Sequence, residues 1–257
     1  MAYYQRYTLP ESCSTPEDLT AALKYMAAHQ VETLTLPTTF TKREEVTALL
    51  KHVSSAHREA STELCEYSPF AKSLSYGYRG YEGREYQINL TRIYSDGFET
   101  AREQIDAVTA YCRETLDSLY AEGELRADMT QKEKLEVLCG WVVLNHQYDL
   151  TYTRRDPYRM MTEGSGVCEG YTALYTMLCR MEGIPIQAEQ GIAYNGLPPE
   201  GGAHIWNRLD NCEECGGTHF IDTTWCDPIP DRPGQVNWEW FWVDGDLFGE
   251  THVADTP

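Results

Sequence analysis

The order of secondary-structure signals constrains this 257-residue chain more than any other feature. Between residues 96 and 182, apolar side chains recur at helical spacing in three segments, about 99–121, 130–146 and 167–181. After residue 182, the pattern changes to the extended segments PIQAEQGIAY, AHIWNRLD and THFIDTTW. Helices followed by strands predict an α+β domain, in which the helices pack on an antiparallel sheet.

Residues 1–95 show a separate, mixed pattern. A first helix is expected after Thr15-Pro16-Glu17-Asp18, which has a cap, a proline and acids in the first turn. The strand VETLTL follows, then a helix over roughly 42–60, then a hairpin of KSLSYGYR and EYQINLTRIY. These signals predict a small N-terminal α/β region of unknown role, with the second domain covering residues 96–257.

Composition and charge limit the classes of binding partner and the cellular compartment that we expect for this protein. The chain has 21 Lys and Arg against 40 Asp and Glu, and a net charge of −19 argues against nucleic acid or an anionic membrane as partner. No signal peptide is visible at the N-terminus, so we expect a cytoplasmic protein, and secretion of a longer precursor stays open. Nine scattered cysteines predict reduced thiols rather than a disulfide framework. The sequence leaves the oligomeric state undetermined.

Cys168 has the setting of an activated nucleophile. A helical apolar stripe begins at Tyr171, and the flexible Gly164-Ser165-Gly166 precedes it, so the helix is expected to start near Val167-Cys168. A thiol at that point lies beside unpaired N–H groups and the positive end of the helix dipole, which both favour the thiolate. The same N–H groups would hold a developing oxyanion.

Two later segments supply a base and a carboxylate. His204 opens the strand AHIWNRLD, and THFIDTTW follows across the turn NCEECGG. If that hairpin is centred near Glu213, opposite residues sum to about 426, which pairs His204 with Asp222. The carboxylate would then orient the imidazole. A register slip of one residue would separate the two side chains onto opposite faces.

The blocks GVCEGYT, AHIWN and HFIDTTWCDP resemble the three signature blocks of the transglutaminase-like superfamily. The resemblance covers roughly residues 96–257, and the segments NHQYD and WFWVDGD are similar to those of its bacterial members. It implies a papain-like core with the nucleophile at a helix N-terminus. Block by block, it assigns the nucleophile to Cys168, the base to His204 and the orienting acid to Asp222.

The same resemblance implies acyl transfer through a thioester, on a peptide or protein substrate, without a metal or organic cofactor. Release by water would make the protein a peptidase or amidase, which is the favoured interpretation, and release by an amine would make it a protein-glutamine transglutaminase. A catalytically silent binding module and an acetyltransferase stay open. The oxyanion-hole tryptophan of animal transglutaminases has no obvious counterpart, and Tyr148 or Gln147 are the candidates for its place.

Three further residues are expected to line the substrate cleft. Glu169 and Tyr171 flank Cys168, and Trp206 shares a strand face with His204. The segment Arg154-Arg155-Asp156, by contrast, is expected to be a solvated loop.

The Cys212-x-x-Cys215 pair is one half of a zinc knuckle, with His219 and Cys226 nearby in the sequence. No second CxxC exists, and His219 and Cys226 are expected on strands that lead away from the tip. An unliganded turn is therefore favoured, and a structural metal or a redox pair stays open.

Overall fold

The computed structural model describes residues 2–194 and 200–255. Most of the loop that precedes His204 therefore lies outside the described residues. The chain divides into two compact units, one up to Glu103 and one from Gln104 onward. This division falls inside helix α4 (Phe98–Ala121), whereas the sequence places a boundary at residue 95, just before that helix.

The first unit packs helices on an antiparallel sheet of order β1-β3-β2. Its strands are β1 (Thr33–Pro37), β2 (Ala71–Arg79) and β3 (Gln87–Tyr94). Its helices are η1 (Ala2–Arg6), α1 (Pro16–Ala28), α2 (Arg43–Leu50), α3 (Val53–Glu63) and η2 (Ser68–Phe70). Apolar side chains of α1, α2, α3 and β3 form one buried core.

Local signals predicted most of this unit. Thr15 caps α1, because its Oγ1 accepts a hydrogen bond of 3.1 Å from the Asp18 backbone N–H. The β2–β3 hairpin also forms as predicted. The single helix expected over 42–60 is wrong in one respect: it is two helices that break after Leu50. The break lets Val46 and Val53, one on each side of it, both enter the core.

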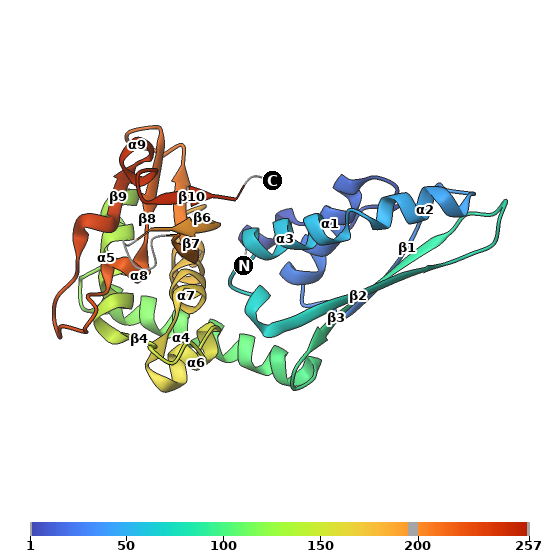
Figure 1. The fold of residues 1–257 in the computed structure, drawn as a ribbon. Helices are drawn as coiled ribbons and strands as arrows, with labels where there is room; N and C mark the ends of the chain where they lie inside the picture. Colours follow the sequence, from blue (N-terminus) through green and yellow to red (C-terminus); the bar gives the residue numbers. More distant parts are fainter. Residues whose placement is uncertain (1, 195–199, 256–257) are drawn as a thin grey trace. The chain divides into compact units, whose positions relative to one another are not determined.

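The second unit is an α+β domain, which confirms the predicted fold class (Figure 1). Its five-stranded antiparallel sheet has the order β10-β6-β7-β8-β9. The strands are β6 (Gln187–Ala193), β7 (Gly202–Asp210), β8 (Thr218–Ile221), β9 (Phe241–Asp244) and β10 (His252–Ala254). A separate parallel pair joins β4 (Gln147–Tyr148) to β5 (Ser165–Gly166).

Helix α7 (Cys168–Met181) lies at the centre of this unit. It packs on β7 and against α5 (Gln131–Asn145), and all its residues from Gly170 to Arg180 are buried. The other helices are α6 (Pro157–Glu163), α8 (Thr223–Cys226), η3 (Trp238–Trp240) and α9 (Gly245–Phe248). None of the helices in the described parts of the chain combines the length and the apolar character needed to span a membrane.

The β7–β8 hairpin has a different register from the predicted one. Asn207 lies opposite Ile221, so the next position on each strand would bring Trp206 level with Asp222. The prediction that His204 lies directly opposite Asp222 is therefore wrong by two positions along β7.

The turn between the two strands accounts for this shift in register. Gly216 and Gly217 both adopt positive φ angles, 67° and 73°, and the turn that they form delays the start of β8. Because side chains alternate with a period of two, a shift of two positions keeps His204 and Asp222 on one face. The two residues meet diagonally instead of directly across the strands.

Gly191 fixes the position of the last strand. It lies in β6, between Ala254 of β10 and His204 of β7. A Cβ atom at Gly191 would lie 2.0 Å from the Val253 carbonyl oxygen and 2.8 Å from Ala254 Cα, and both are backbone atoms. Only glycine therefore lets β10 pair closely with β6.

We expect Gly191→Ala to push β10 away from the sheet and to lower the free energy of unfolding by about 1–3 kcal/mol. Urea denaturation measures this change. The control is Gly202→Ala on the neighbouring strand, where an added Cβ meets no atom within 4 Å and the change should stay within about 0.5 kcal/mol. Equal effects of the two substitutions would contradict the close packing of β10.

Candidate active site

Cys168 is the first residue of α7, where the sequence predicts it, and Val167 is the N-cap. The backbone N–H of Tyr171 donates to the Val167 carbonyl at 3.1 Å, which starts the helical hydrogen-bond ladder. The N–H groups of Cys168, Glu169 and Gly170 precede this bond and have no acceptor within the helix. They lie beside the thiol and can stabilise a thiolate or an oxyanion.

His204, near the start of β7, and Asp222, just after β8, lie next to each other. Nε2 of His204 is 2.7 Å from Oδ2 of Asp222, and His204 also hydrogen-bonds the thiol of Cys168. Because a carboxylate only accepts, Nε2 carries a proton and Nδ1 is left to face the sulfur. The structure thus brings together the three residues predicted from three separate blocks, in the order thiol, imidazole, carboxylate.

Asp222 is fully buried, and both of its carboxylate oxygens are used. Oδ1 accepts hydrogen bonds of 3.1 Å from the backbone N–H groups of Thr224 and Trp225, which leaves Oδ2 for the imidazole. Asp222 therefore caps α8. For this reason the extended segment predicted through Trp225 is wrong at its end: β8 stops at Ile221 and the chain turns into a helix.

A second histidine, which the sequence analysis missed, also binds Asp222. Nε2 of His252 lies 3.1 Å from Oδ2 of Asp222. The His252 ring stacks on Phe248 with their centroids 3.9 Å apart, and its side chain is completely buried. His252 belongs to β10, a strand of three residues, which is too short for any periodic signal.

The electrostatics of this cluster favour a charged imidazole. Burial lowers the pKa of His204, but the Asp222 carboxylate and the Cys168 thiol outweigh burial and raise this pKa to about 10. Burial raises the pKa of Asp222, but His204 and His252 outweigh it and lower this pKa to about 2. Asp222 therefore keeps its negative charge wherever His204 gains or loses its proton.

Glu169 touches the thiol itself. The Cys168 Sγ donates to Oε2 of Glu169 at 3.2 Å, and Nη1 of Arg155 donates to Oε1 at 2.6 Å. The pKa of Cys168 is raised, first by burial and then by the Glu169 carboxylate, while His204 acts to lower it. Glu169 thus opposes the thiolate that His204 and the helix N-terminus favour.

Tyr148 and Gln147, the two candidates for the oxyanion hole, differ in their neighbours, and Tyr148 has the Cys168 thiol among the groups that shift its pKa. It is paired with Gly166, two residues before Cys168 in the chain. Burial raises the pKa of Tyr148, and the neighbouring Cys168 raises it further, so the phenol keeps its proton. Nε2 of Gln147 instead donates to Asp231 at 3.0 Å. Of the two candidates for the oxyanion hole, Tyr148 is thus the one whose hydroxyl is influenced by the Cys168 thiol.

Tyr171 and Trp206 do not line a cleft, which corrects two of the predictions. Tyr171 lies on the buried face of α7, and its hydroxyl donates to Asp227 Oδ2 at 2.5 Å. Trp206 is 1% exposed, because α9 covers its ring through Phe248. Its Nε1 donates to Glu189 at 3.1 Å. Both residues support the site from the core.

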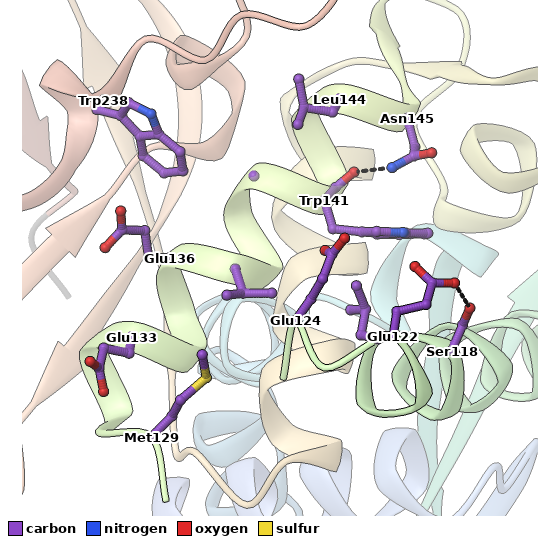
Figure 2. A pocket seen from close by; sticks show the side chains of 13 residues that line it. Ser118, Glu122, Glu124, Met129, Glu133, Glu136, Trp141, Leu144, Asn145 and Trp238 are labelled. Carbon is purple, nitrogen blue, oxygen red and sulfur yellow. Dashed lines mark hydrogen bonds between the residues drawn. The ribbon is translucent and has the colours of Figure 1, made fainter. Parts of the chain in front are cut away.

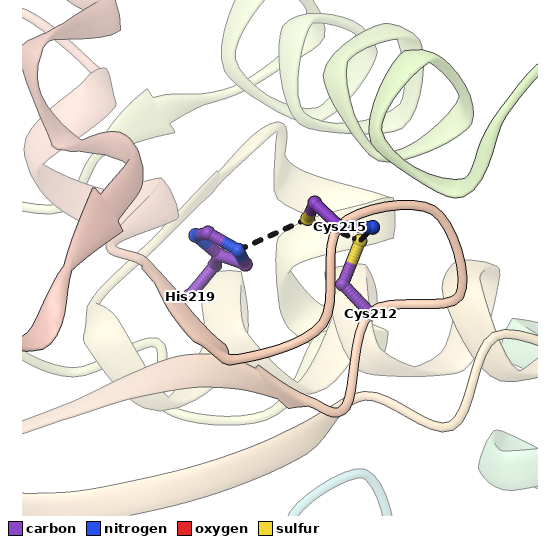
Figure 3. Close-up of side chains that lie close together, drawn as sticks. All are labelled: Cys212, Cys215 and His219. Atoms are coloured by element: carbon purple, nitrogen blue, oxygen red, sulfur yellow. Dashed lines mark hydrogen bonds between the residues drawn. The ribbon is translucent and has the colours of Figure 1, made fainter.

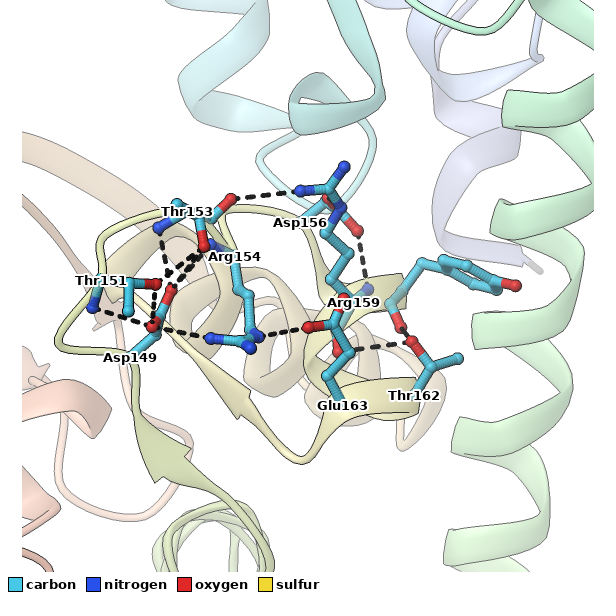
Figure 4. Close-up of polar contacts among 9 residues, drawn as sticks. Asp149, Thr151, Thr153, Arg154, Asp156, Arg159, Thr162 and Glu163 are labelled. Carbon is cyan, nitrogen blue, oxygen red and sulfur yellow. Dashed lines mark hydrogen bonds and ion pairs between the residues drawn. The ribbon is translucent and has the colours of Figure 1, made fainter.

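The segment between β4 and α6 is a hydrogen-bonded cluster around Asp149, which corrects the expectation of a simple solvated loop (Figure 4). The Asp149 carboxylate accepts from the backbone N–H groups of Thr151, Thr153 and Arg154 at 2.9–3.0 Å, and from Nη1 of Arg154 at 2.8 Å. Burial raises the pKa of Asp149, but these bonds hold it far below its usual range. The Arg154 carbonyl in turn accepts from the Val167 N–H at 3.0 Å, so the cluster positions the residue before Cys168.

Two of the larger grooves among the described residues of this unit differ in their relation to the site. One, of about 630 Å³, follows α5 and is lined by four glutamates and Trp141, and none of the predicted site residues borders it (Figure 2). The other, of about 750 Å³, is lined by Thr224, Trp225 and Trp240, among others. The Trp225 ring centroid lies 5.6 Å from that of His204, so the second groove adjoins the site.

Comparison with known families identifies this part of the chain. Residues 118–212 match the family model of the transglutaminase-like superfamily. This segment is therefore similar to the transglutaminase-like superfamily. The match contains Cys168 and His204 and ends before Asp222. It confirms the family that the three sequence blocks predict.

Solved structures similar to this chain share little sequence with it. A candidate cysteine protease from Cytophaga hutchinsonii is 17% identical with a TM-score of 0.34, over 64% of this chain and 65% of that one. A TGase is 13% identical with a TM-score of 0.39, over 76% and 51%. A candidate protease from Parabacteroides distasonis is 12% identical with a TM-score of 0.28, over 59% and 36%. The matches thus span less than two thirds of each of these proteins. No curated protein matches the chain.

Removal of the charge next to the thiol tests the role of Glu169. We expect Glu169→Gln to lower the pKa of Cys168 by up to about one unit, because a negative neighbour no longer disfavours the thiolate. The pH profile of iodoacetamide labelling at Cys168 measures the shift. Glu163→Gln, which removes a carboxylate that binds Arg154 in the same segment, should leave the profile unchanged. An upward shift in Glu169→Gln would contradict this account.

The His252 contact predicts a pH-dependent loss of stability. The pKa of Asp222 falls from 3.8 to about 2 on folding, so its contribution is present above about pH 4 and is lost as the pH falls toward 2. His252→Phe removes one donor to this carboxylate and should lower the unfolding free energy by about 1.5–3 kcal/mol at pH 6.

The difference between His252→Phe and the wild type should shrink as the pH falls from 4 to 2, where Asp222 becomes protonated. His252→Gln, whose amide can still donate, should retain part of the stability. Urea denaturation between pH 2 and pH 6 gives the comparison. A difference that stays constant with pH would show that His252 only fills space.

Proposed function

We propose that this protein is a cysteine-dependent acyl-transfer enzyme that acts on amide bonds of a peptide or protein, with Cys168 as nucleophile. The transglutaminase-like superfamily is a family of cysteine-dependent enzymes, which supports the proposal. One observation carries it: His204 donates from Nε2 to a buried carboxylate at 2.7 Å, which turns Nδ1 toward a thiol at a helix N-terminus. Structural histidines and cysteines have no need of this arrangement.

The first half of the reaction forms a thioester. In the reactive state the proton shared by Cys168 and His204 lies on Nδ1 of His204, and the sulfur of Cys168 attacks the carbonyl carbon of the amide. The negative charge on the carbonyl oxygen is stabilised by the free N–H groups at the start of α7, and Tyr148 is a candidate second donor. As the tetrahedral intermediate collapses, the C–N bond breaks and His204 gives its proton to the departing amine.

Asp222 makes this proton cycle possible. Its charge stabilises the imidazolium that forms during attack, and its hydrogen bond keeps Nδ1 directed at the sulfur. The opposing effect of Glu169 on the thiol fits a site in which the thiolate forms when substrate arrives. A bound amide group that displaces the Glu169 carboxylate from the sulfur would lower the pKa of Cys168 in the complex.

The second half releases the acyl group to water or to an amine. We favour water, and hence a peptidase or amidase, because Cys168 is partly exposed and the groove beside Trp225 adjoins His204. Aromatic side chains and the amides of Gln235 and Asn237 line this groove, a combination suited to an extended peptide. Release to an amine would make the protein a transglutaminase.

We expect His204→Ala to slow the labelling of Cys168 by iodoacetamide relative to that of Cys215 in the same molecule, because His204 acts to lower the pKa of the Cys168 thiol. The variant should stay folded by circular dichroism. Peptide mapping separates the nine cysteines. Equal labelling of Cys168 and Cys215 in the folded wild type, unaffected by His204→Ala, would overturn the proposed function.

Turnover gives the second test. Cys168→Ala should lower the cleavage of a fluorogenic peptide library by at least about 10³-fold without a loss of stability. A labelled primary amine in the same assay separates the two outcomes: hydrolysis leaves the amine unincorporated, and transamidation couples it to a glutamine. Full activity in Cys168→Ala would exclude this nucleophile.

A further inference from the structure

The tip of the β7–β8 hairpin gathers side chains that the proposed reaction does not use. The loop runs from Asn211 to Gly217 and contains Cys212 and Cys215. The sequence favours an unliganded turn here, with His219 on a strand that leads away from the tip. His219 does lie on β8, and its Nε2 nevertheless lies 3.3 Å from Sγ of Cys215 (Figure 3). Cys226, the other neighbour in the sequence, is buried in α8 and is not part of this group.

The three ligand atoms are close enough to share one ion. The Sγ atoms of Cys212 and Cys215 are 2.7 Å apart, and all three atoms lie within 4.8 Å of one another. Tetrahedral zinc, with bonds of about 2.3 Å to sulfur and 2.0 Å to nitrogen, needs sulfur–sulfur distances of about 3.8 Å and sulfur–nitrogen distances of about 3.5 Å. A small movement of one cysteine side chain gives this geometry.

His219 is oriented as a metal ligand usually is. Its ring stacks on Trp242, with centroids 4.1 Å apart and 12° between the planes, so it has little freedom to rotate. Nδ1 faces the Asp244 carboxylate at 3.6 Å, because the two residues pair across β8 and β9. A carboxylate beside Nδ1 favours a proton there, which leaves the Nε2 lone pair free to bind a metal. A disulfide between the two cysteines would require none of this.

The loop also places a backbone donor beside one of the sulfurs. The backbone N–H of Cys215 donates to Sγ of Cys212 at 3.4 Å, an interaction that strengthens when the sulfur is charged. Gly216 folds the loop back on itself, and its N–H donates to the Cys212 carbonyl at 2.8 Å. Two thiolates and an imidazole form a ligand set that selects zinc over the hard cations magnesium and calcium.

We propose that Cys212, Cys215 and His219 bind one Zn²⁺ ion, with water in the fourth position because Cys215 is exposed. Binding releases the two thiol protons. The ion would lie away from the thiol of Cys168, since six positions along β7 separate His204 from Asp210 at the base of the tip, about 20 Å at full extension.

The consequence for the fold is a fixed hairpin tip. The tip already contacts α5, where the Gln131 backbone N–H donates to Glu214 at 2.6 Å and Gln131 Oε1 accepts from the Glu213 N–H at 3.0 Å. The ion would lock this loop, and with it the register of the strands that hold His204 and Asp222.

The test uses the full chain, reduced and stripped of metal, titrated with Zn²⁺ against a chromophoric chelator. We expect one Zn²⁺ per chain, and a higher midpoint of thermal unfolding in its presence. Co²⁺ in place of zinc should give a thiolate-to-metal charge-transfer band. Cys212→Ser with Cys215→Ser should abolish both signals, and His219→Gln should weaken binding at least about tenfold. Cys168→Ser, which removes a thiol elsewhere, should bind zinc like the wild type.

Two results would overturn the site. One is a reduced, folded protein that takes up no stoichiometric zinc. This result would overturn the site also if peptide mass spectrometry of the untreated protein reveals a Cys212–Cys215 disulfide. The other is zinc binding that survives the double cysteine substitution. Neither depends on turnover, so the metal site and the proposed function can fail independently.

Discussion

The site depends on one buried carboxylate. Asp222 is removed from water, and its two oxygens accept from two backbone N–H groups and two imidazoles. Burial of a charge without such partners would cost several kcal/mol. Each partner comes from a different place: His204 from β7, His252 from β10 and the N–H groups from α8. The carboxylate therefore joins three elements to one another, and it fixes the imidazole that faces the thiol.

Much of this could be predicted because the signals are local. A capping residue three positions from an acid sets the start of a helix, and Thr15 and Thr130 both behave in this way. A run of glycines before an apolar stripe placed Cys168 at the start of α7. The alternation of side chains along β7 and β8 correctly predicted that His204 and Asp222 lie on one face. This prediction holds although the register was wrong by two positions, because side chains alternate with a period of two.

What the sequence did not reveal depends on contacts between distant segments. His252 approaches Asp222 only because a three-residue strand pairs with β6, and no pattern of three residues is periodic. Asp149 looks like an ordinary loop acid until Thr151, Thr153 and Arg154 fold around its carboxylate. Trp206 lies on the same strand face as His204, yet α9 covers it, and strand periodicity carries no information on what covers a face. The glycine pair that accounts for the shifted register lies in the same turn as Cys215, and no sequence signal predicts the contact that His219, four residues after Cys215, makes with it.

The pairing of β10 with β6 sets an order of assembly. The final strand supplies His252 only after the chain has been synthesised almost to residue 254 and has docked against Gly191. Until then Asp222 has one imidazole partner instead of two. The buried carboxylate thus acquires its last hydrogen-bond donor only when the fold is complete.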